Sequence, residues 1–330
     1  MIVDKSVWKS SNVDTIFSII VPTFNEEIYI GALLKRLFSF ALDDFLIEVI
    51  VIDNGSTDGT LRIVKEYPCR FYVLPDATIA AMRNYGARIA SGSLLGFIDA
   101  DCMPIREWAI ISKAQLDEDL TVGVTGSYYS MSPEPTWVER LWCTMRHKTI
   151  GLVNFLPAGN MAVRKNEFVD IGGFPEKMIT GEDYALCQLY IKENLLIVNN
   201  PLLKNVHLGN AKTLEDIRKK EKWYGMSYRQ SIYKNIRSKV FWASCVFLFG
   251  FFLAVSSLFL SLVNKNNFLD LLNLAGLFVC LFVVFGYAWV ATLRSGKFRY
   301  IAGYILIFFS YFFGRSQALI DIIFNKNIDS

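Results

Sequence analysis

The feature that most constrains this chain is a charge-free apolar segment from Val240 to Val263. A helix over this segment, at about 1.5 Å per residue, is longer than the roughly 30 Å hydrocarbon core of a bilayer. A second segment, Leu271–Leu293, is similar, whereas Tyr300–Phe324 is interrupted by Arg315 and Asp321. The third segment is either a further span or a shorter span with an amphipathic tail, so two to three transmembrane helices are expected.

Basic residues gather just before the first apolar segment and again between the second and third. Such clusters mark the cytoplasmic side of a span and attract anionic lipid. We therefore expect a multi-pass protein of the cell (inner) membrane, in three parts. These are a cytosolic domain over residues 1–210, a basic amphipathic interfacial helix over 211–239 and a membrane region over 240–330. The basic residues are Arg218, Lys219, Lys220, Lys222, Arg229, Lys234, Arg237 and Lys239, then Arg294, Lys297 and Arg299.

The composition and net charge of the chain exclude several classes of protein. The chain is 53% apolar with a mean hydropathy of +0.32, too apolar for a wholly soluble protein. Its six cysteines include no Cys-x-x-Cys pair, so neither a disulfide framework nor a zinc site is indicated, and a reducing compartment fits. Met1–Asp14 is polar and lacks an apolar signal region, which also favours a cytosolic domain. A net charge of +3 gives no indication of a nucleic acid polymer as partner.

Short apolar runs alternate with helical patterns over the first hundred residues. This rhythm predicts an α/β fold whose sheet is mostly parallel and covered by helices on both faces. The expected strands are Phe17–Val21, Glu48–Ile52, Arg70–Leu74 and Leu94–Ile98, and the expected helices are Glu26–Phe40, Thr60–Tyr67 and Thr78–Ala90. Beyond them we expect helices at Trp108–Leu116, Thr136–His147, Asp183–Asn194 and Thr213–Tyr233, the last on the membrane, and strands at Val122–Tyr129, Asn160–Val163 and Leu195–Val198.

Two carboxylates, Asp99 and Asp101, directly follow the strand at Leu94–Ile98. In open α/β sheets ligands bind beyond the carboxyl ends of the strands. Two acids there are suited to a hard divalent cation, which in turn binds a diphosphate. A pair of solvated acids is the simpler alternative. A phosphatase with an Asp-x-Asp-x-Thr motif fits poorly, because Met103 occupies the position of the threonine.

Other polar residues have both a structural and a functional interpretation. Asp53 is a turn residue or a hydrogen-bond acceptor for a nucleotide, and Asp58 is favoured as a helix cap. Arg83 is a surface arginine or a nucleotide contact. His207 is structural, a metal ligand or a diphosphate contact.

Two further motifs are equally open. Glu182 and Asp183 open a helix, where they serve as an N-terminal capping pair or as acid–base groups. Gly159 and Asn160 form an ordinary turn or let a sugar approach the backbone.

Five motifs in order resemble glycosyltransferase family 2. They read SIIVPTFNEE, VIVIDNGSTDGT, AAMRNYGARIASGSLLGFIDAD, AGNMAVRKNEFVDIGGFPE and GEDYALC. The resemblance covers residues of about 16–210, and it implies the GT-A Rossmann-like fold and a nucleotide-diphosphate sugar donor. The apolar C-terminal region is similar to that of membrane-bound members that build cell-surface glycans.

The resemblance also implies roles for individual residues. Asp183 would be the general base of an inverting transfer, with Glu182 beside it on the acceptor or sugar. Asp101 would ligate Mg²⁺ or Mn²⁺, and His207 is a candidate second ligand. The donor would contact Pro22, Thr23, Glu26, Asp53, Arg83, Asp99, Gly159 and Asn160.

The chain departs from the polymerising members of the family, because their Gln-x-x-Arg-Trp motif is missing after residue 183. We therefore expect transfer of one sugar, with a UDP-sugar favoured, to a membrane-associated acceptor such as a lipid-linked glycan in cell-surface polysaccharide synthesis. The alternative is a non-catalytic, membrane-bound subunit that binds nucleotide sugars or acts as a scaffold. A lipid-carrier or transporter component fits less well, because the apolar segments are few and the cytosolic domain is large.

Overall fold

The computed structural model describes residues 16–40, 46–145, 150–229, 236–264 and 267–324. The polar segment Met1–Asp14 and Lys234 lie outside these residues. The chain forms two compact units. The first comprises residues 1–133 and 146–210, and the second comprises residues 134–145 and 211–330.

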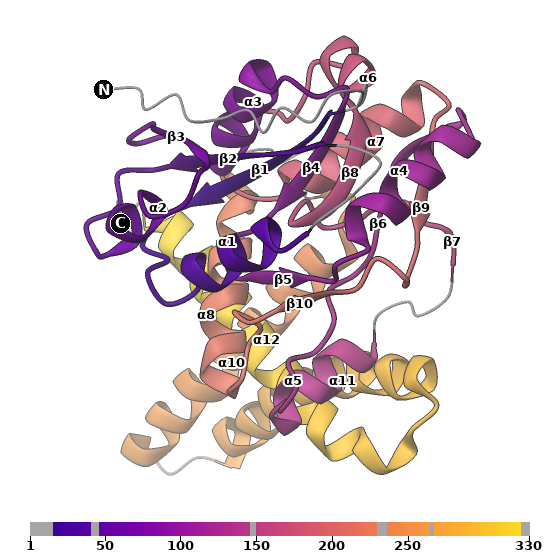
Figure 1. The fold of residues 1–330 in the computed structure, drawn as a ribbon. Coiled ribbons are helices and arrows are strands. Elements are labelled where there is room, and N and C mark those ends of the chain that lie inside the picture. The colour runs from indigo at the N-terminus through magenta and orange to yellow at the C-terminus, as the bar shows by residue number, and fades with distance from the viewer. Residues whose placement is uncertain (1–15, 41–45, 146–149, 230–235, 265–266, 325–330) are drawn as a thin grey trace. The chain divides into compact units, whose positions relative to one another are not determined.

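An eight-stranded sheet forms the centre of the first unit as far as it is described (Figure 1). Its strand order is β3-β2-β1-β4-β8-β6-β9-β7. The strands are β1 (Ile16–Thr23), β2 (Leu46–Asp53), β3 (Arg70–Val73), β4 (Leu94–Ile98), β6 (Val122–Gly126), β7 (Gly151–Leu152), β8 (Asn160–Arg164) and β9 (Leu196–Asn199).

The sheet is mixed, although its first half is parallel as the sequence predicts. Strands β1 to β4 run parallel, and β6 runs parallel to β9. Strand β8 lies between β4 and β6 and is antiparallel to both, which the strand–helix rhythm does not predict. The reason is that the chain returns into the sheet at the edge where β4 ends, so that Ile98 pairs with Asn160. This return places Asn160 next to the end of β4.

Helices cover both faces of the sheet, which confirms the expected layering. One face packs on α1 (Ile30–Phe38), α2 (Thr60–Val64) and α4 (Trp108–Glu118), and the other on α3 (Ile79–Ile89), α6 (Lys165–Asp170) and α7 (Glu182–Lys192). Alternate residues of β1 divide between the two cores, with Ile19 in the first and Ile20 in the second. Small residues let α3 approach closely, because a Cβ on Gly86 would lie 2.6 Å from Cγ2 of Ile20.

A two-stranded ribbon lies apart from the main sheet. It pairs β5 (Cys102–Pro104) antiparallel with β10 (Asn205–His207), and Cys102 is opposite His207. Neither strand is predicted from the sequence, because three residues are too few to show a period-two pattern. The ribbon nevertheless brings His207 next to the Asp99–Asp101 segment.

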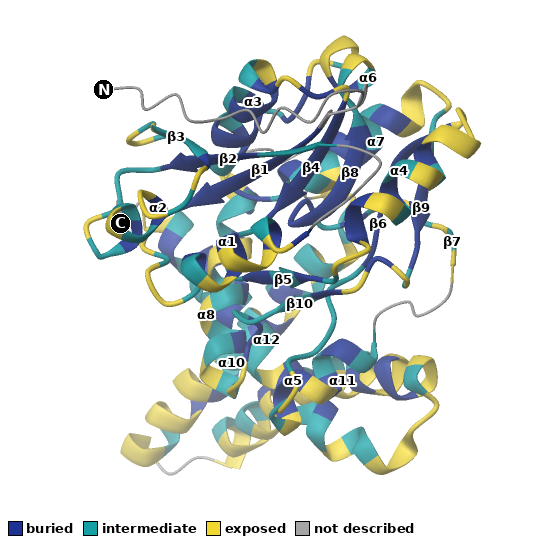
Figure 2. Ribbon diagram, viewed as in Figure 1, coloured by how far each residue is buried: buried dark blue, intermediate teal, exposed yellow. Residues whose placement is uncertain are grey.

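The second unit is helical in its described part. It contains α5 (Trp137–Thr144), α8 (Leu214–Gly225), the 3₁₀ turn η1 (Met226–Arg229), α10 (Lys239–Asn264), α11 (Asn267–Ser295), the 3₁₀ turn η2 (Phe298–Tyr300) and α12 (Ile301–Ile323). Three segments have the length and apolar composition to cross a membrane: Lys239–Asn264, Asn267–Ser295 and Phe298–Ile323. Large apolar residues are exposed along α10 and α11. Figure 2 colours the exposed residues of the ribbon yellow.

The helix expected over Thr213–Tyr233 is shorter in the structure. It begins at a capping box, in which Thr213 Oγ1 accepts from the N–H of Asp216 and Asp216 accepts from the N–H of Thr213. It ends at Gly225 and continues as η1, while residues 230–235 lie outside the description. Helix α5 also belongs to this unit, because Val138 packs in one cluster with Ile217.

We predict that Gly126→Ala destabilises the first unit. A Cβ on Gly126 would lie 2.2 Å from the carbonyl oxygen of Asn160, so β6 and β8 would have to separate. The expected cost is about 1–3 kcal/mol, seen as a lower thermal unfolding midpoint of the full chain. The matched control is Gly151→Ala, because a Cβ there has no atom within 4 Å. Equal midpoints for the two variants would contradict the packing described.

Candidate active site

The polar residues singled out from the sequence gather at one edge of the sheet. Thr23 and Asp53 end β1 and β2 and are paired in register. Asp99 directly follows β4, and Asn160 begins β8 opposite Ile98. Neighbouring strand ends therefore carry the candidate residues, as expected for an open α/β sheet.

A buried arginine joins two of the predicted motifs. Arg83 on α3 is 2% exposed. Its Nη2 donates to Oδ1 of Asp99 at 2.6 Å, and its Nη1 donates to Oε1 of Glu182 at 2.7 Å. Burial would lower the pKa of Arg83, but these two carboxylates raise it above its usual value. Arg83 is thus not a surface arginine, since it links the segment after β4 to the start of α7.

Asp99 is held from both sides as an anion. Its Oδ1 accepts from Arg83, and its Oδ2 accepts from the hydroxyl of Tyr129 at 2.9 Å. Burial would raise the pKa of Asp99, but the Arg83 guanidinium lowers it below the usual range. The space beside it admits only a glycine, because a Cβ on Gly159 would lie 2.0 Å from Oδ2 of Asp99.

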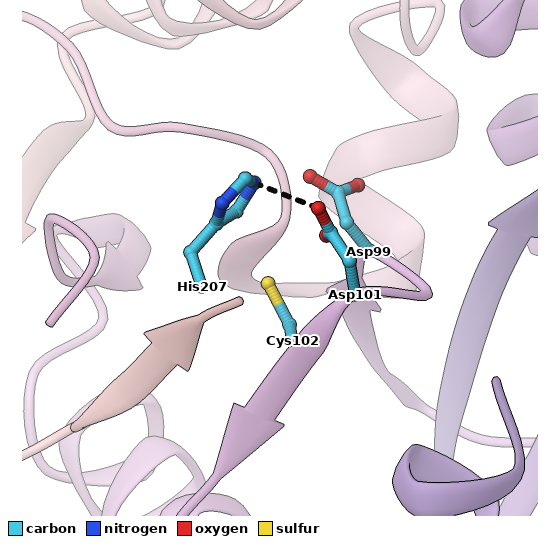
Figure 3. A group of neighbouring side chains, drawn as sticks. All are labelled: Asp99, Asp101, Cys102 and His207. Atoms are coloured by element: carbon cyan, nitrogen blue, oxygen red, sulfur yellow. Dashed lines mark ion pairs between the residues drawn. The ribbon is translucent and has the colours of Figure 1, made fainter. Parts of the chain in front are cut away.

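A cluster of possible metal ligands lies next to Asp99. Asp101, Cys102 and His207 each offer a ligand atom, and with Asp99 these atoms all lie within 4.8 Å of one another. Figure 3 shows Asp101 and His207 facing each other, with Oδ2 and Nε2 3.5 Å apart. The ring of His207 also packs on Tyr129, with the ring centroids 4.4 Å apart. The β5–β10 ribbon therefore assembles this cluster from distant parts of the chain.

Negative charge accumulates around this cluster. Burial raises the pKa of Glu26 to about 7, and the neighbouring Asp101, Asp99 and Asp58 contribute to the increase. The part of the shift that comes from the three neighbouring acids reflects local negative charge, which a bound cation would offset.

The donor set fits a divalent cation. Carboxylate oxygens with one imidazole nitrogen suit Mg²⁺ and, better, Mn²⁺. Asp101 and His207 are the residues best placed to hold it, because both oxygens of Asp99 already accept hydrogen bonds from Arg83 and Tyr129.

Asp183 stands at the start of α7. The helix follows Gly181, whose φ of 79° is in the left-handed region that favours glycine. Burial raises the pKa of Asp183 to about 7, and the adjacent Glu182 adds to this. Such a carboxylate accepts protons near neutral pH, which is the property required of a general base. Asp183 Oδ1 also accepts from the N–H of Tyr184, so its orientation is fixed.

At the end of β2, Asp53 has the geometry of a turn residue. It is fully buried, and its carboxylate accepts from the N–H groups of Gly55 and Ser56 and from the hydroxyl of Ser56. Pro22 and Thr23 are buried on the adjacent strand, and the Thr23 hydroxyl has no hydrogen-bond partner in the described part of the chain. The nucleotide contact expected of Asp53 remains a prediction.

Asn160 lies in the framework beneath the site. Its amide oxygen accepts from the indole N–H of Trp108 at 2.6 Å, and its amide nitrogen donates to Ser127 and to the carbonyl of Leu203. Asn160 is fully buried, so these bonds fix where β8 meets the Asp99 segment. Asp58 accepts from Thr60 N–H in the first turn of α2, as its expected capping role requires, although Gly59 is the residue at the cap position.

Three residues of the site are not found from the sequence. Tyr129 donates to Asp99, Cys102 belongs to the ligand cluster, and Gly209 faces Asp101, where a Cβ would lie 2.0 Å from Oδ2. The position of Cys102 beside Asp101 is a weak signal, whereas Tyr129 and Gly209 carry none.

Comparison with known proteins agrees with this geometry. Residues 18–172 match the family model described as Glycosyl transferase family 2. This stretch, a little under half of the chain, is therefore similar to family 2 glycosyltransferases. The mannosyltransferase PcManGT from Pyrobaculum calidifontis, solved in complex with GDP-Man and Mn²⁺, superposes with a TM-score of 0.58 at 18% identity. The superposition covers 97% of this chain and 92% of that one, and it supports the GT-A fold.

Two relatives by sequence are also glycosyltransferases. Glycosyltransferase AglE from Haloferax volcanii is 28% identical over 176 residues, which is 50% of this chain and 58% of that protein. Validoxylamine A glucosyltransferase from Streptomyces hygroscopicus subsp. jinggangensis is 39% identical over 92 residues, which is 26% of this chain and 21% of that protein. The chain therefore matches less than two thirds of the length of either relative.

We predict that Gly209→Ala weakens metal binding. The added Cβ would displace the Asp101 carboxylate from its position facing His207. Because disturbing the support of a ligand costs about 10–100-fold in metal affinity, Mn²⁺ binding followed by electron paramagnetic resonance should weaken by at least about 10-fold. Gly151→Ala serves as the control and should bind Mn²⁺ as the native chain does. Unchanged affinity in Gly209→Ala would exclude Asp101 as a ligand.

Proposed function

We propose that this protein is a membrane-bound glycosyltransferase that moves one sugar from a nucleotide-diphosphate sugar to a membrane-associated acceptor, with inversion at the anomeric carbon. The observation that carries the proposal is the buried ion-pair chain Asp99–Arg83–Glu182. It joins Asp99, which is expected to contact the donor, to Glu182, which is the neighbour of the expected general base. The match of residues 18–172 to the family 2 model supports the same reaction class.

The donor side of the site is the edge around β1, β2 and β4. Mg²⁺ or Mn²⁺ held by Asp101 and His207 would neutralise the diphosphate and the charge that grows on it as it departs. Asp99, kept ionised by Arg83 and Tyr129, is suited to accept hydrogen bonds from the ribose hydroxyls. A GDP-sugar and Mn²⁺ occupy the structural neighbour from Pyrobaculum calidifontis, and a UDP-sugar is the donor we favour for this chain.

The acceptor side is the start of α7. Asp183 takes the proton from the acceptor hydroxyl as its oxygen forms a bond to the anomeric carbon. The bond from that carbon to the diphosphate oxygen breaks in the same displacement, and the nucleoside diphosphate leaves with the electron pair. Glu182 does not take part in proton transfer, because the residue is 6% exposed and its carboxylate is paired with Arg83. Glu182 instead maintains the raised proton affinity of Asp183.

The apolar helices of the second unit suggest where the acceptor is found. Helices α10 and α11 expose large apolar side chains along most of their length, which supports the placement of these helices in a bilayer. An enzyme fixed to a membrane in this way meets acceptors that are themselves anchored there, such as a lipid-linked glycan of cell-surface polysaccharide synthesis. The basic residues beside these helices favour the cytoplasmic face for the catalytic domain.

We predict that Asp183→Asn abolishes transfer while donor binding remains. Loss of a general base lowers kcat by about 100- to 10,000-fold, whereas the donor-binding edge is unchanged. Transfer is measured with membrane acceptors and Mn²⁺, with chelation by EDTA as the metal-free reference, and donor binding is measured by calorimetry. Glu193→Gln, at the exposed C-terminal end of the same helix, is the control and should retain full activity. Full activity in Asp183→Asn would remove the assigned base.

The pH dependence tests the same residue independently. Since the base must be deprotonated, log(kcat/KM) should rise with pH below about 7 and level off above it. Removing the negative charge of Glu182 with Glu182→Gln should lower the pKa of Asp183 and move this midpoint to lower pH. If the midpoint of the rise in log(kcat/KM) is the same in Glu182→Gln as in the native chain, the titrating group is not Asp183.

A further inference from the structure

Helix α12 differs from the two apolar helices before it. It is the least apolar of the three candidate spans, and it contains Arg315 and Asp321. Arg315 Nε contacts Oε2 of Glu221 at 2.7 Å, and Asp321 Oδ2 contacts Nζ of Lys222 at 2.8 Å. Both partners lie on α8, so the charges of α12 are paired with a helix outside the apolar region.

Helix α8 lies directly against the last part of α12. A Cβ on Gly314 would be 2.3 Å from the carbonyl oxygen of Arg218, and a Cβ on Gly225 would be 2.5 Å from Cβ of Ala318. These contacts follow the same direction along both helices, so α8 runs beside α12 rather than crossing it at a point.

Helix α5 covers the first part of α12 in the same way. A Cβ on Gly303 would be 2.4 Å from Cδ1 of Leu141, and the hydroxyls of Thr144 and Tyr304 are 2.8 Å apart. Further along, the rings of Trp142 and Tyr311 are 6.2 Å apart. Together α5 and α8 line α12 from residue 303 to residue 321, about 27 Å at 1.5 Å per residue.

Such a lining is incompatible with a bilayer crossing by α12. Helix α8 carries charged residues on several sides, and Glu215 and Lys219 are exposed. If α12 crossed the roughly 30 Å hydrocarbon core, α8 and its exposed charges would lie inside that core, where each ionised group costs several kcal/mol.

We propose that α12 lies along the membrane interface together with α5 and α8, and that the chain crosses the bilayer only as the hairpin α10–α11. The inference goes beyond the proposed function and does not depend on it. An interfacial helix buries one apolar face at the boundary of headgroups and acyl chains. On α12 that face is the exposed stripe of Ala302, Leu306 and Phe309.

The contacts of α12 with the hairpin agree with this placement. Ser316 Oγ lies 3.5 Å from the carbonyl oxygen of Ser244, near the start of α10. The ring of Phe312 lies 4.9 Å from that of Tyr287, in the later part of α11. Because α10 and α11 are antiparallel neighbours, the start of one and the end of the other lie at the same membrane face. Both ends of this chain are then on that face.

Depth measurements with two matched variants test the proposal. Phe252 of α10 and Phe309 of α12 are 51% and 44% exposed, and each lies near the middle of its helix. Each is changed to cysteine in a Cys245→Ala background, because the other five cysteines are buried, and is spin-labelled in vesicles. Collision with oxygen and with a water-soluble nickel complex should place Phe252→Cys deep and Phe309→Cys shallow. Equal depth at the two positions would overturn the proposal.

Sidedness provides a second, independent measurement. The full chain carries a different epitope tag at each end and is collected as sealed vesicles of one orientation. An added protease should remove both tags or neither, and an impermeant maleimide should label Asn267→Cys only from the opposite face. Protection of one tag alone, or labelling of Asn267→Cys from the face that carries the tags, would overturn the proposal. Neither readout requires activity, so failure here is distinct from failure of the proposed reaction.

Discussion

The guanidinium of Arg83 is the interaction on which the site depends. It is buried, and it holds Asp99 with one nitrogen and Glu182 with another. Removing it would leave both carboxylates without a cationic partner, and breaking a buried ion pair costs about 3–5 kcal/mol. The same charge keeps Asp99 ionised and opposes the burial and the Glu182 charge that raise the pKa of Asp183. The chemistry proposed for the donor and for the acceptor therefore depends on one side chain.

The charge arrangement explains why two neighbouring acids behave differently. Glu182 and Asp183 are consecutive, but only Glu182 reaches the guanidinium. Asp183 remains beside it without an ion pair of its own in the described structure, and burial raises its pKa to about 7. The turn at Gly181 starts α7 directly before the two acids. Two residues of the same kind thus have different surroundings, which matches the separate roles proposed for them.

The sequence predicts the parts of the structure that depend on local pattern. Apolar runs and helical spacing locate strands such as β1 and β4 and helices such as α3, because burial on one face imposes a period. The same logic places Asp99 and Asp53 at strand ends. Pairings between distant segments leave no periodic pattern in the sequence. The antiparallel insertion of β8, the β5–β10 ribbon and the Tyr129 bond to Asp99 depend on how distant segments meet.

Arg83 has one feature that local sequence pattern predicts and another that depends on distant segments. Its position in a helix of small residues indicates close packing on the sheet, which the structure confirms. Its pairing with Glu182 depends on α7, which lies 99 residues further along the chain, and no local pattern indicates that contact. The same limit applies in the second unit. The sequence shows the charges of Arg315 and Asp321, but it does not show their partners on α8.

The β5–β10 ribbon has a consequence for how the protein is made. Asp101 leaves the ribosome early, whereas His207 is synthesised near the end of the first unit. Until β10 pairs with β5, the ligand cluster of the nascent chain lacks His207. The cation proposed for this cluster would therefore find its complete set of ligands only after almost the whole domain has been synthesised.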